Sequence, residues 1–326
     1  MGSILPCPCG DNPHVVDTSA LSDSRFRAMG SDCHVLIHGG TAEDLTFAEA
    51  EVRRLEALWS RFREDSEVSR LNAADGSPAP VSVETMALLC RAVRAQRLTG
   101  GWFDPFMGRD IVGLGYGQDF GELTQVSAAP GVSTYRLDAG ASAPRLERVI
   151  PDASLGVTRY PLMAQLPPGF DFDPGGVGKG LGADLVTLAL LRRGVPGALV
   201  NLGGDLRCRG RHPDDGWEVT IGNPLDGGTL EEFVRLTDGA VATSTPLKRR
   251  WIDGGGQIRN HLFHPARGES IEPEVASVSV IAPTGWLAEA LCKALLIGGP
   301  DVGRPLLNMH RAAGIVVTLD GSVIRL

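Results

Sequence analysis

The 326-residue sequence contains no apolar run of the roughly 18 residues that cross a bilayer, so no membrane partner is expected. It also has no long cluster of basic residues. With 31 Lys and Arg against 39 Asp and Glu, the net charge is −8, and nucleic acid is not an expected partner. The N-terminus has neither a basic residue before Arg25 nor an apolar core, so we expect no secretory signal and a cytoplasmic protein.

The six cysteines show no CxxC pair and no regular spacing, which is typical of a protein kept in a reducing compartment. Cys7, Cys9 and His14 could supply half of a metal site, but no second pair of ligands follows at zinc spacing. We favour the alternative, a tail of little order over residues 1–24, which are rich in Pro, Ser, Asp and Gly. No linker divides the remainder, so residues 25–326 are predicted to form one domain.

The many turns implied by 42 Gly and 22 Pro argue against a helical bundle. Thr41 and Asp44 resemble a capping box, and the apolar residues that follow at helical spacing predict a helix. Further helices are predicted over residues 83–97 and 178–193 and after Thr284. Residues 101–150 are expected to be mostly loop, and strands are predicted over residues 26–39, 198–209, 217–221, 233–243, 258–264 and 275–282, with a terminal hairpin turning on two residues, 320–321. Because most of these strands follow one another without helices between them, the predicted class is α+β, with mainly antiparallel sheets flanked by helices.

A glycine-rich segment, DPGGVGKG at residues 173–180, precedes one predicted helix. It is not a Walker P-loop, because Gly180 stands where the magnesium-binding hydroxyl belongs and Asp173 stands where the first Gly belongs. The GLGYGQ segment at residues 113–118 likewise fails the dinucleotide fingerprint at its last position. Successive glycines, a helix N-terminus and Lys179 still favour a phosphate near residues 175–180. The alternative is a tight turn that enters a helix.

Several short segments occur together in one order and spacing. They are FRAMGS at 26–31, WSRFREDSEVSRLN at 59–72, GWFDP at 101–105, the glycine-rich segment at 173–180 followed by Asp184, NLGGDL at 201–206, AVATS at 240–244 and NHLFHP at 260–265. In this combination the chain resembles the ApbE family, the FAD:protein FMN transferases, over about residues 26–326. The family's fold, an α+β core of mainly antiparallel sheets, agrees with the class predicted above.

The resemblance implies a reaction on FAD. A Thr or Ser hydroxyl of an acceptor protein attacks the FMN phosphorus, AMP leaves, and a phosphoester-linked flavin remains on the acceptor. The resemblance assigns flavin and adenine contacts to Met29, Phe62, Trp102, Phe103 and Asp104. It also places Asp173, Lys179 and Asp184 along the nucleotide-binding turn, and His261 near the attacked phosphate as general base.

Each of these residues has a structural alternative. Met29 and Phe62 are of the type that fills ordinary cores, and a lone His on a strand, such as His261, is more often a structural group. We expect Asp205, after two glycines, to close a turn and do not place it in the site. His264 stands where the family usually has Asp.

The resemblance also implies a magnesium ion, held by backbone in the glycine-rich turn at Gly176 and by side chains on the last long helix. The family has an acidic residue there and a Thr four positions later. This chain keeps a carboxylate at Glu289, but Cys292 and Lys293 occupy positions where oxygen ligands are expected, and an ammonium cannot ligate magnesium.

Two hypotheses follow for the Glu289–Lys293 pair. In the first, Lys293 replaces part of the metal's charge and neutralises the pyrophosphate, so that transfer has an altered metal dependence. In the second, the protein binds FAD, or uses it for another purpose, without transferring FMN. The plain alternative for a Glu and a Lys four residues apart is an exposed ion pair on a helix.

Overall fold

A single eight-stranded sheet forms the centre of the protein. The computed structural model describes residues 21–113, 162–213, 215–253 and 256–326. Within them the strand order of the sheet is β1-β2-β5-β6-β9-β14-β15-β16, and all neighbours are antiparallel. These strands are β1 (Leu21–Ala28), β2 (Ser31–His38), β5 (Gly197–Leu202), β6 (Asp205–Gly210), β9 (Gly239–Ser244), β14 (Val275–Ala282), β15 (Ala313–Thr318) and β16 (Val323–Arg325). The predicted α+β class with antiparallel pairing is confirmed.

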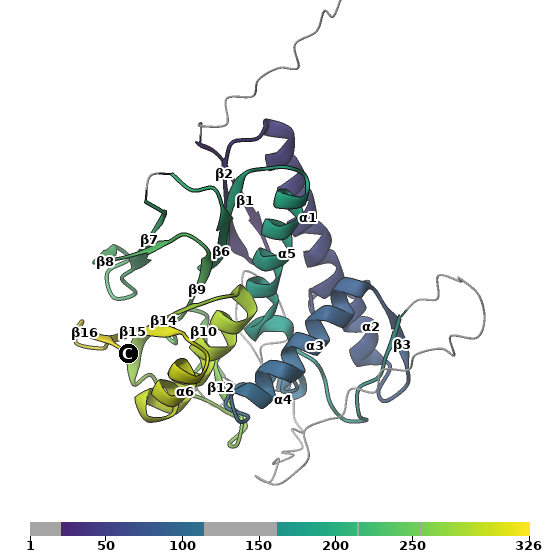
Figure 1. Ribbon diagram of the computed structural model, residues 1–326. Coiled ribbons are helices and arrows are strands. Elements are labelled where there is room, and N and C mark those ends of the chain that lie inside the picture. Colours follow the sequence, from purple (N-terminus) through teal and green to yellow (C-terminus); the bar gives the residue numbers. More distant parts are fainter. Residues whose placement is uncertain (1–20, 114–161, 214, 254–255) are drawn as a thin grey trace, which may run out of the picture.

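Three helices pack against this sheet (Figure 1): α1 (Ala42–Trp59) along β1 and β2, α5 (Gly178–Arg192) along β5 and β6, and α6 (Gly285–Met309) along β9 and β14. The helix α3 (Val83–Leu98) packs against α1 and α6. Shorter elements complete this part: α2 (Glu67–Ala73), β3 (Ala79–Val81), α4 (Gly108–Gly113), β4 (Leu162–Ala164) and a 3-10 turn at Pro174–Gly176. No helix in the described part of the chain combines the length and the apolar character that crossing a bilayer requires.

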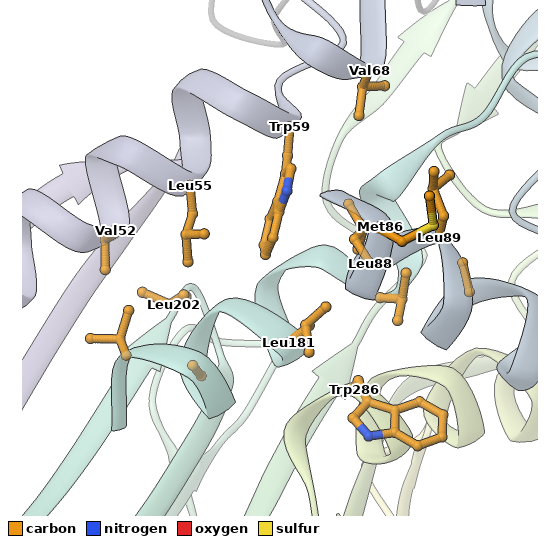
Figure 2. Packing of buried hydrophobic residues seen from close by; sticks show 14 of the residues in the cluster. Val52, Leu55, Trp59, Val68, Met86, Leu88, Leu89, Leu181, Leu202 and Trp286 are labelled. Carbon is orange, nitrogen blue, oxygen red and sulfur yellow. The ribbon is translucent and has the colours of Figure 1, made fainter. Parts of the chain in front are cut away.

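The apolar side of α1 holds it against α5. The predicted capping box forms, since the Thr41 N–H donates to the Asp44 carboxylate over 3.0 Å. Figure 2 shows Val52, Leu55 and Trp59 projecting from α1 toward Leu202 and α5, in one buried cluster that also contains Leu181. Trp59 ends the helix, so its burial fixes where the following segment leaves the core.

The helices α5 and α6 touch backbone to backbone at their N-terminal ends. A Cβ atom on Gly180 would lie 2.3 Å from the Gly285 carbonyl oxygen, which is closer than such atoms approach. Glycine at position 180 is therefore what allows this crossing. The crossing brings the first turn of α5 beside the first turns of α6, and the candidate site is built there.

Hairpins occupy the opposite face of the sheet and the connection from β9 to β14. The hairpin of β7 (Trp217–Gly222) and β8 (Thr229–Leu236) packs its Trp217 against apolar residues of β5, β6 and β9. The connection holds β10 (Arg250–Ile252) paired with β11 (Ile258–Asn260), and β12 (Phe263–His264) paired with β13 (Glu269–Ser270).

The predicted helices are confirmed, whereas several predicted strands are wrong in their extent. The strand expected over residues 26–39 is the β1–β2 hairpin, which turns at Met29 and Gly30 with φ of 52° and 63°. Its first strand begins at Leu21, inside the predicted tail. The strands expected over residues 198–209, 233–243 and 258–264 are likewise each divided in two by a two-residue interruption.

The terminal hairpin also differs from the prediction. Thr318 donates its N–H to the Ser322 carbonyl and accepts from Gly321, so the loop has three residues, with Gly321 at a φ of 88°. The predictions for Cys7, Cys9 and His14 and for most of the loop at 101–150 lie outside the described residues.

Candidate active site

A cleft open to solvent lies where α1, α5 and α6 meet the connection between β9 and β14. The cleft collects predicted site residues from six separate parts of the chain: Met29, Phe62, Phe103, Asp104, Asp173, Gly176, Lys179, His261 and Lys293. The structure therefore brings together residues that the sequence spreads over more than 260 positions.

The β1–β2 turn aims Met29 into the cleft. A non-glycine residue at a φ of 52° is uncommon, and here the Met29 N–H donates to the Glu56 carboxylate, which ties the turn to α1. Phe62 is 38% exposed and carries the Arg61 guanidinium 4.3 Å above its ring. These apolar surfaces at the mouth can take up a flat ring system.

The glycine-rich turn forms a second wall. The Asp173 carboxylate accepts the Gly175 N–H over 2.8 Å and so caps the 3-10 turn. A Cβ atom on Gly176 would lie 2.3 Å from the buried Phe103 ring, so only glycine fits at this position. Asp173 also lies 3.6 Å from the Arg61 guanidinium. The predicted tight turn and the predicted helix entry are both present, and the turn lines a cleft.

Burial raises the pKa of Asp104, a further carboxylate of the cleft wall, against the opposing hydrogen bond from the Phe106 N–H. The carboxylate is held over 2.9 Å by that N–H, so its orientation is fixed. It can act as a hydrogen-bond partner for a polar edge of a bound ring.

Lys293 and Glu289 form a buried ion pair on α6. The Lys293 ammonium lies 3.2 Å from Glu289 Oε1, and Glu289 Oε2 accepts the Gly180 N–H over 2.8 Å. Burial disfavours the Lys293 ammonium, but the Glu289 and Asp205 carboxylates more than offset this and raise its pKa. Burial raises the pKa of Glu289, against the pull of Lys293. The plain alternative of an exposed helix pair is wrong, since Glu289 is 0% and Lys293 8% exposed.

His261 stands in the cleft wall as a neutral imidazole. Its burial, together with the cationic charges of Arg249, Lys293 and Lys179, lowers its pKa to about 3. Its Nδ1 is buried without a hydrogen-bond partner in the described part of the protein. With this pKa the imidazole is a weak base, and an anion bound beside it would raise its pKa and make it a better proton acceptor.

Three predicted site residues do not line the cleft. Trp102 packs edge-on against His264, with ring centroids 5.5 Å apart. Asp184 accepts the N–H groups of Gly285 and Trp286 over 2.8 and 3.1 Å and so caps α6. Burial raises the pKa of Asp184 to about 6, and the two N–H groups oppose this. Asp184 therefore positions α6. Glu289, the third of these residues, joins α6 to α5 through the Gly180 N–H.

Sequence reasoning missed three residues of the site. Glu56 and Arg249 line the cleft. The Arg249 guanidinium also lies 3.4 Å from the Gly30 carbonyl and 3.3 Å from Ser31 Oγ, so it bridges to the β1–β2 turn. Asp205 is fully buried, pairs with Lys179, and leaves Oδ1 without a partner among the residues that the structure describes. A carboxylate beside two glycines at the end of a buried strand was the available signal for Asp205.

Comparison with known proteins shows the family of the chain. A profile described as the ApbE family matches residues 29–317. The chain is 27% identical over 298 residues to the FAD:protein FMN transferase of Vibrio cholerae, which covers 86% of this chain and 83% of that protein. With the protein of the same description from Escherichia coli (strain K12) it shares 25% identity over 321 residues, 96% of this chain and 89% of that one. With the protein of this description from Rhodobacter capsulatus it shares 31% identity over 305 residues, which cover 91% of this chain and 55% of that one.

Solved structures show the same fold. The ApbE protein from Thermotoga maritima matches with a TM-score of 0.76 at 21% identity, over 94% of this chain and 97% of that chain. The flavin transferase ApbE from Vibrio cholerae matches with a TM-score of 0.72 at 21% identity, over 94% and 96%. The architecture is thus that of the ApbE structures. Because the family profile also spans most of its length, the chain belongs to the ApbE family, and the curated relatives named above are enzymes.

Proposed function

We propose that this protein binds FAD in the cleft and transfers its FMN moiety to a Ser or Thr hydroxyl of an acceptor protein, releasing AMP. Family membership and the name shared by the curated relatives support the reaction class. One observation carries the assignment to this cleft. Lys179, His261 and Lys293, which come from three separate elements, line a single pocket beside apolar Met29 and Phe62.

The charges of the cleft suit a pyrophosphate. Lys179 follows the first residue of α5, where the helix dipole also favours an anion. Lys293 and Arg249 add two cationic groups to the same cleft. Lys179 and Lys293 are already paired with Asp205 and Glu289, so their role is to orient the phosphates of FAD and to stabilise the charge that develops on the departing AMP.

The transfer step balances within this site. The acceptor oxygen forms a bond to the FMN phosphorus, the bond from that phosphorus to the bridging oxygen breaks, and AMP leaves with this oxygen. The hydroxyl proton passes to the neutral imidazole of His261. The raised pKa of Lys293 keeps its ammonium protonated as a fixed charge.

We further propose an altered metal dependence. The donor set at Glu289 does not suit the magnesium that the family resemblance implies, because one carboxylate oxygen meets the Lys293 ammonium and the other accepts the Gly180 N–H. Lys293 then supplies the positive charge, as a single charge in place of a divalent ion.

The test has two stages. Calorimetric titration with FAD measures binding, and a purified protein that binds no FAD would sink the whole proposal. FAD cleavage is then followed by AMP release with an acceptor protein, once with magnesium and once with EDTA. We expect AMP release and flavin fluorescence on the acceptor in both. A strict requirement for magnesium would contradict the role given to Lys293, whereas the transferase assignment would stand.

The second candidate function is binding of FAD without transfer. The replacement of a divalent ion by one ammonium favours it, because a single charge stabilises a phosphoryl-transfer transition state less. FAD binding with neither AMP release nor labelled acceptor would identify this function. AMP release without acceptor would instead indicate hydrolysis of FAD.

A further inference from the structure

We propose that the β10–β11 hairpin and the residues before it form the docking surface for the acceptor, and that this surface takes an acidic, apolar segment of the acceptor protein. The inference rests on the proposed function, because a transferase that labels a protein must hold that protein at the mouth of its cleft.

The hairpin is built into the wall of the cleft. The side chain of Trp251 on β10 is buried in one cluster with Met107, Ile111 and Phe263, and these last three residues all line the cleft. The chain also lines the cleft immediately before and after the hairpin, at Arg249 and His261. A protein segment that lies on this hairpin therefore lies within a few residues of the general base.

The opposite face of the hairpin is exposed and apolar. Side chains alternate across a strand, so Ile252 points away from the buried Trp251. Ile252 pairs directly with Ile258 across the hairpin, and the two are 63% and 58% exposed. Two large apolar side chains side by side at such exposure mark a surface suited to a partner.

Basic side chains lie beside this face in a chain of net charge −8. Residues 248–267 contain five basic residues, Lys248, Arg249, Arg250, Arg259 and Arg267, and one acidic residue, Asp253, while the exposed Glu269, Glu272 and Glu274 follow beyond the hairpin. Asp253 pairs with Arg259. Lys248, Arg250 and Arg267 are exposed. None of the ion pairs found among the described residues involves these three side chains.

This arrangement selects the occupant. A basic rim beside an apolar pair attracts a segment that combines Asp or Glu with apolar side chains, and the remaining acidic surface repels it. Charge steering over the Debye length of about 8 Å at physiological salt gives this recognition a marked salt dependence.

The experiment uses the full chain saturated with FAD and three labelled 15-residue peptides with one central Thr. The first peptide carries Asp, Glu and Leu around the Thr, the second has Asn and Gln in place of the acidic residues, and the third has Lys there. Fluorescence anisotropy measures binding at 50 and 300 mM salt. We expect the acidic peptide to bind at least about fivefold more tightly than the neutral one and the basic peptide to bind least, with the difference shrinking at high salt.

Two variants and a matched control locate the surface. K248E/R250E should weaken binding of the acidic peptide about tenfold and remove its salt dependence, and I252S/I258S should weaken binding at both salt concentrations. The control R192E/R304E makes the same charge change elsewhere, since Arg192 lies thirteen residues beyond Lys179 on α5, about 20 Å along the helix axis. FAD affinity should stay within about twofold in all three variants, because none of these side chains lines the cleft.

The outcomes separate this inference from the proposed function. Equal binding of the three peptides, or an equal loss in R192E/R304E, would overturn the docking surface while FAD binding and transfer stand. A single-stranded 15-nucleotide DNA that competes as well as the acidic peptide would also overturn it, as a general attraction for anions. If FAD does not bind, the proposed function fails, and the same peptide series on the FAD-free protein still decides the docking surface.

Discussion

The Lys293 ammonium and the Glu289 carboxylate face each other across 3.2 Å, one turn apart on α6 and almost completely out of contact with water. The second oxygen of Glu289 accepts the Gly180 N–H, so the pair also joins α6 to the first turn of α5. The charge of Lys293 at the cleft thus depends on a carboxylate that never reaches the cleft surface. The same ion pair therefore places a charge at the cleft and holds the two helices together.

Removing the ammonium should unbalance this arrangement. In Lys293→Met, Glu289 keeps its burial and loses its counter-charge, so we expect a loss of about 3–5 kcal/mol in the free energy of unfolding. FAD affinity should fall as well, because one of the cationic groups of the cleft is gone. Chemical denaturation and calorimetry measure the two effects.

The matched control is Glu289→Gln combined with Lys293→Met. This double variant contains no buried charge, and replacing both members of a buried pair is often nearly neutral. We expect it to be more stable than Lys293→Met alone. If the double variant were as unstable as the single one, the ion pair would not be the cause of the loss.

The contact of α5 with α6 leads to a second prediction. In Gly180→Ala the new Cβ would meet the Gly285 backbone at 2.3 Å, and neither backbone can move without shifting a helix. We expect a loss of about 2–3 kcal/mol in the free energy of unfolding. Gly222→Ala is the control, because the nearest atom to its Cβ lies 3.9 Å away, and it should change stability by no more than about 0.5 kcal/mol. Equal losses in the two variants would show that the helix crossing is not tight.

The helices could be predicted from the sequence because their signals are local. The predicted helix over residues 83–97 is α3, Val83–Leu98, and that over 178–193 is α5, Gly178–Arg192. For α3, the Ser82 cap at one end and the glycines after Thr99 at the other fix these bounds within a turn. Strands failed where a tight turn lies inside an apolar run. Met29 takes a positive φ although methionine gives no sign of it, so the first hairpin looked like one strand.

The site could be predicted in part. Residues of the glycine-rich turn and His261 reach the cleft because their segments are short and lie at its edge. Asp184 and Glu289 do not, because helical periodicity gives the face of a helix and says nothing of the neighbour that covers it. Both carboxylates are taken by backbone N–H groups of the crossing helix. Arg249 was missed because its contact with the β1–β2 turn joins residues more than 200 positions apart.

Met29 supports a third prediction, on FAD binding. Met29→Asn keeps a residue that tolerates positive φ and removes the thioether from the cleft. We expect the FAD dissociation constant to rise about tenfold, which corresponds to about 1.4 kcal/mol of lost apolar contact. Stability should fall by about 1 kcal/mol, because Met29 also packs against the core. The companion Met29→Ile puts a β-branched side chain at the same φ and should cost about 1–3 kcal/mol of stability. Unchanged FAD affinity in Met29→Asn would remove Met29 from the binding surface.

The low pKa of His261 makes a prediction about pH. The folded state leaves this imidazole neutral down to about pH 3, whereas the unfolded chain takes up a proton near 6.5. Between these values the unfolded state binds more protons, so this stabilising contribution is complete above pH 6.5 and is lost as the pH falls. From pH 7.5 to 5.0 the loss from His261 is about 2 kcal/mol.

Denaturation of wild type and His261→Asn at both pH values should show a drop smaller by that amount in the variant. His212→Asn, outside the cleft, should retain the drop of the wild type. If His261→Asn lost as much stability on acidification as the wild type, the imidazole would already be charged or solvated in the folded protein, and it could not serve as the buried neutral base of the transfer step.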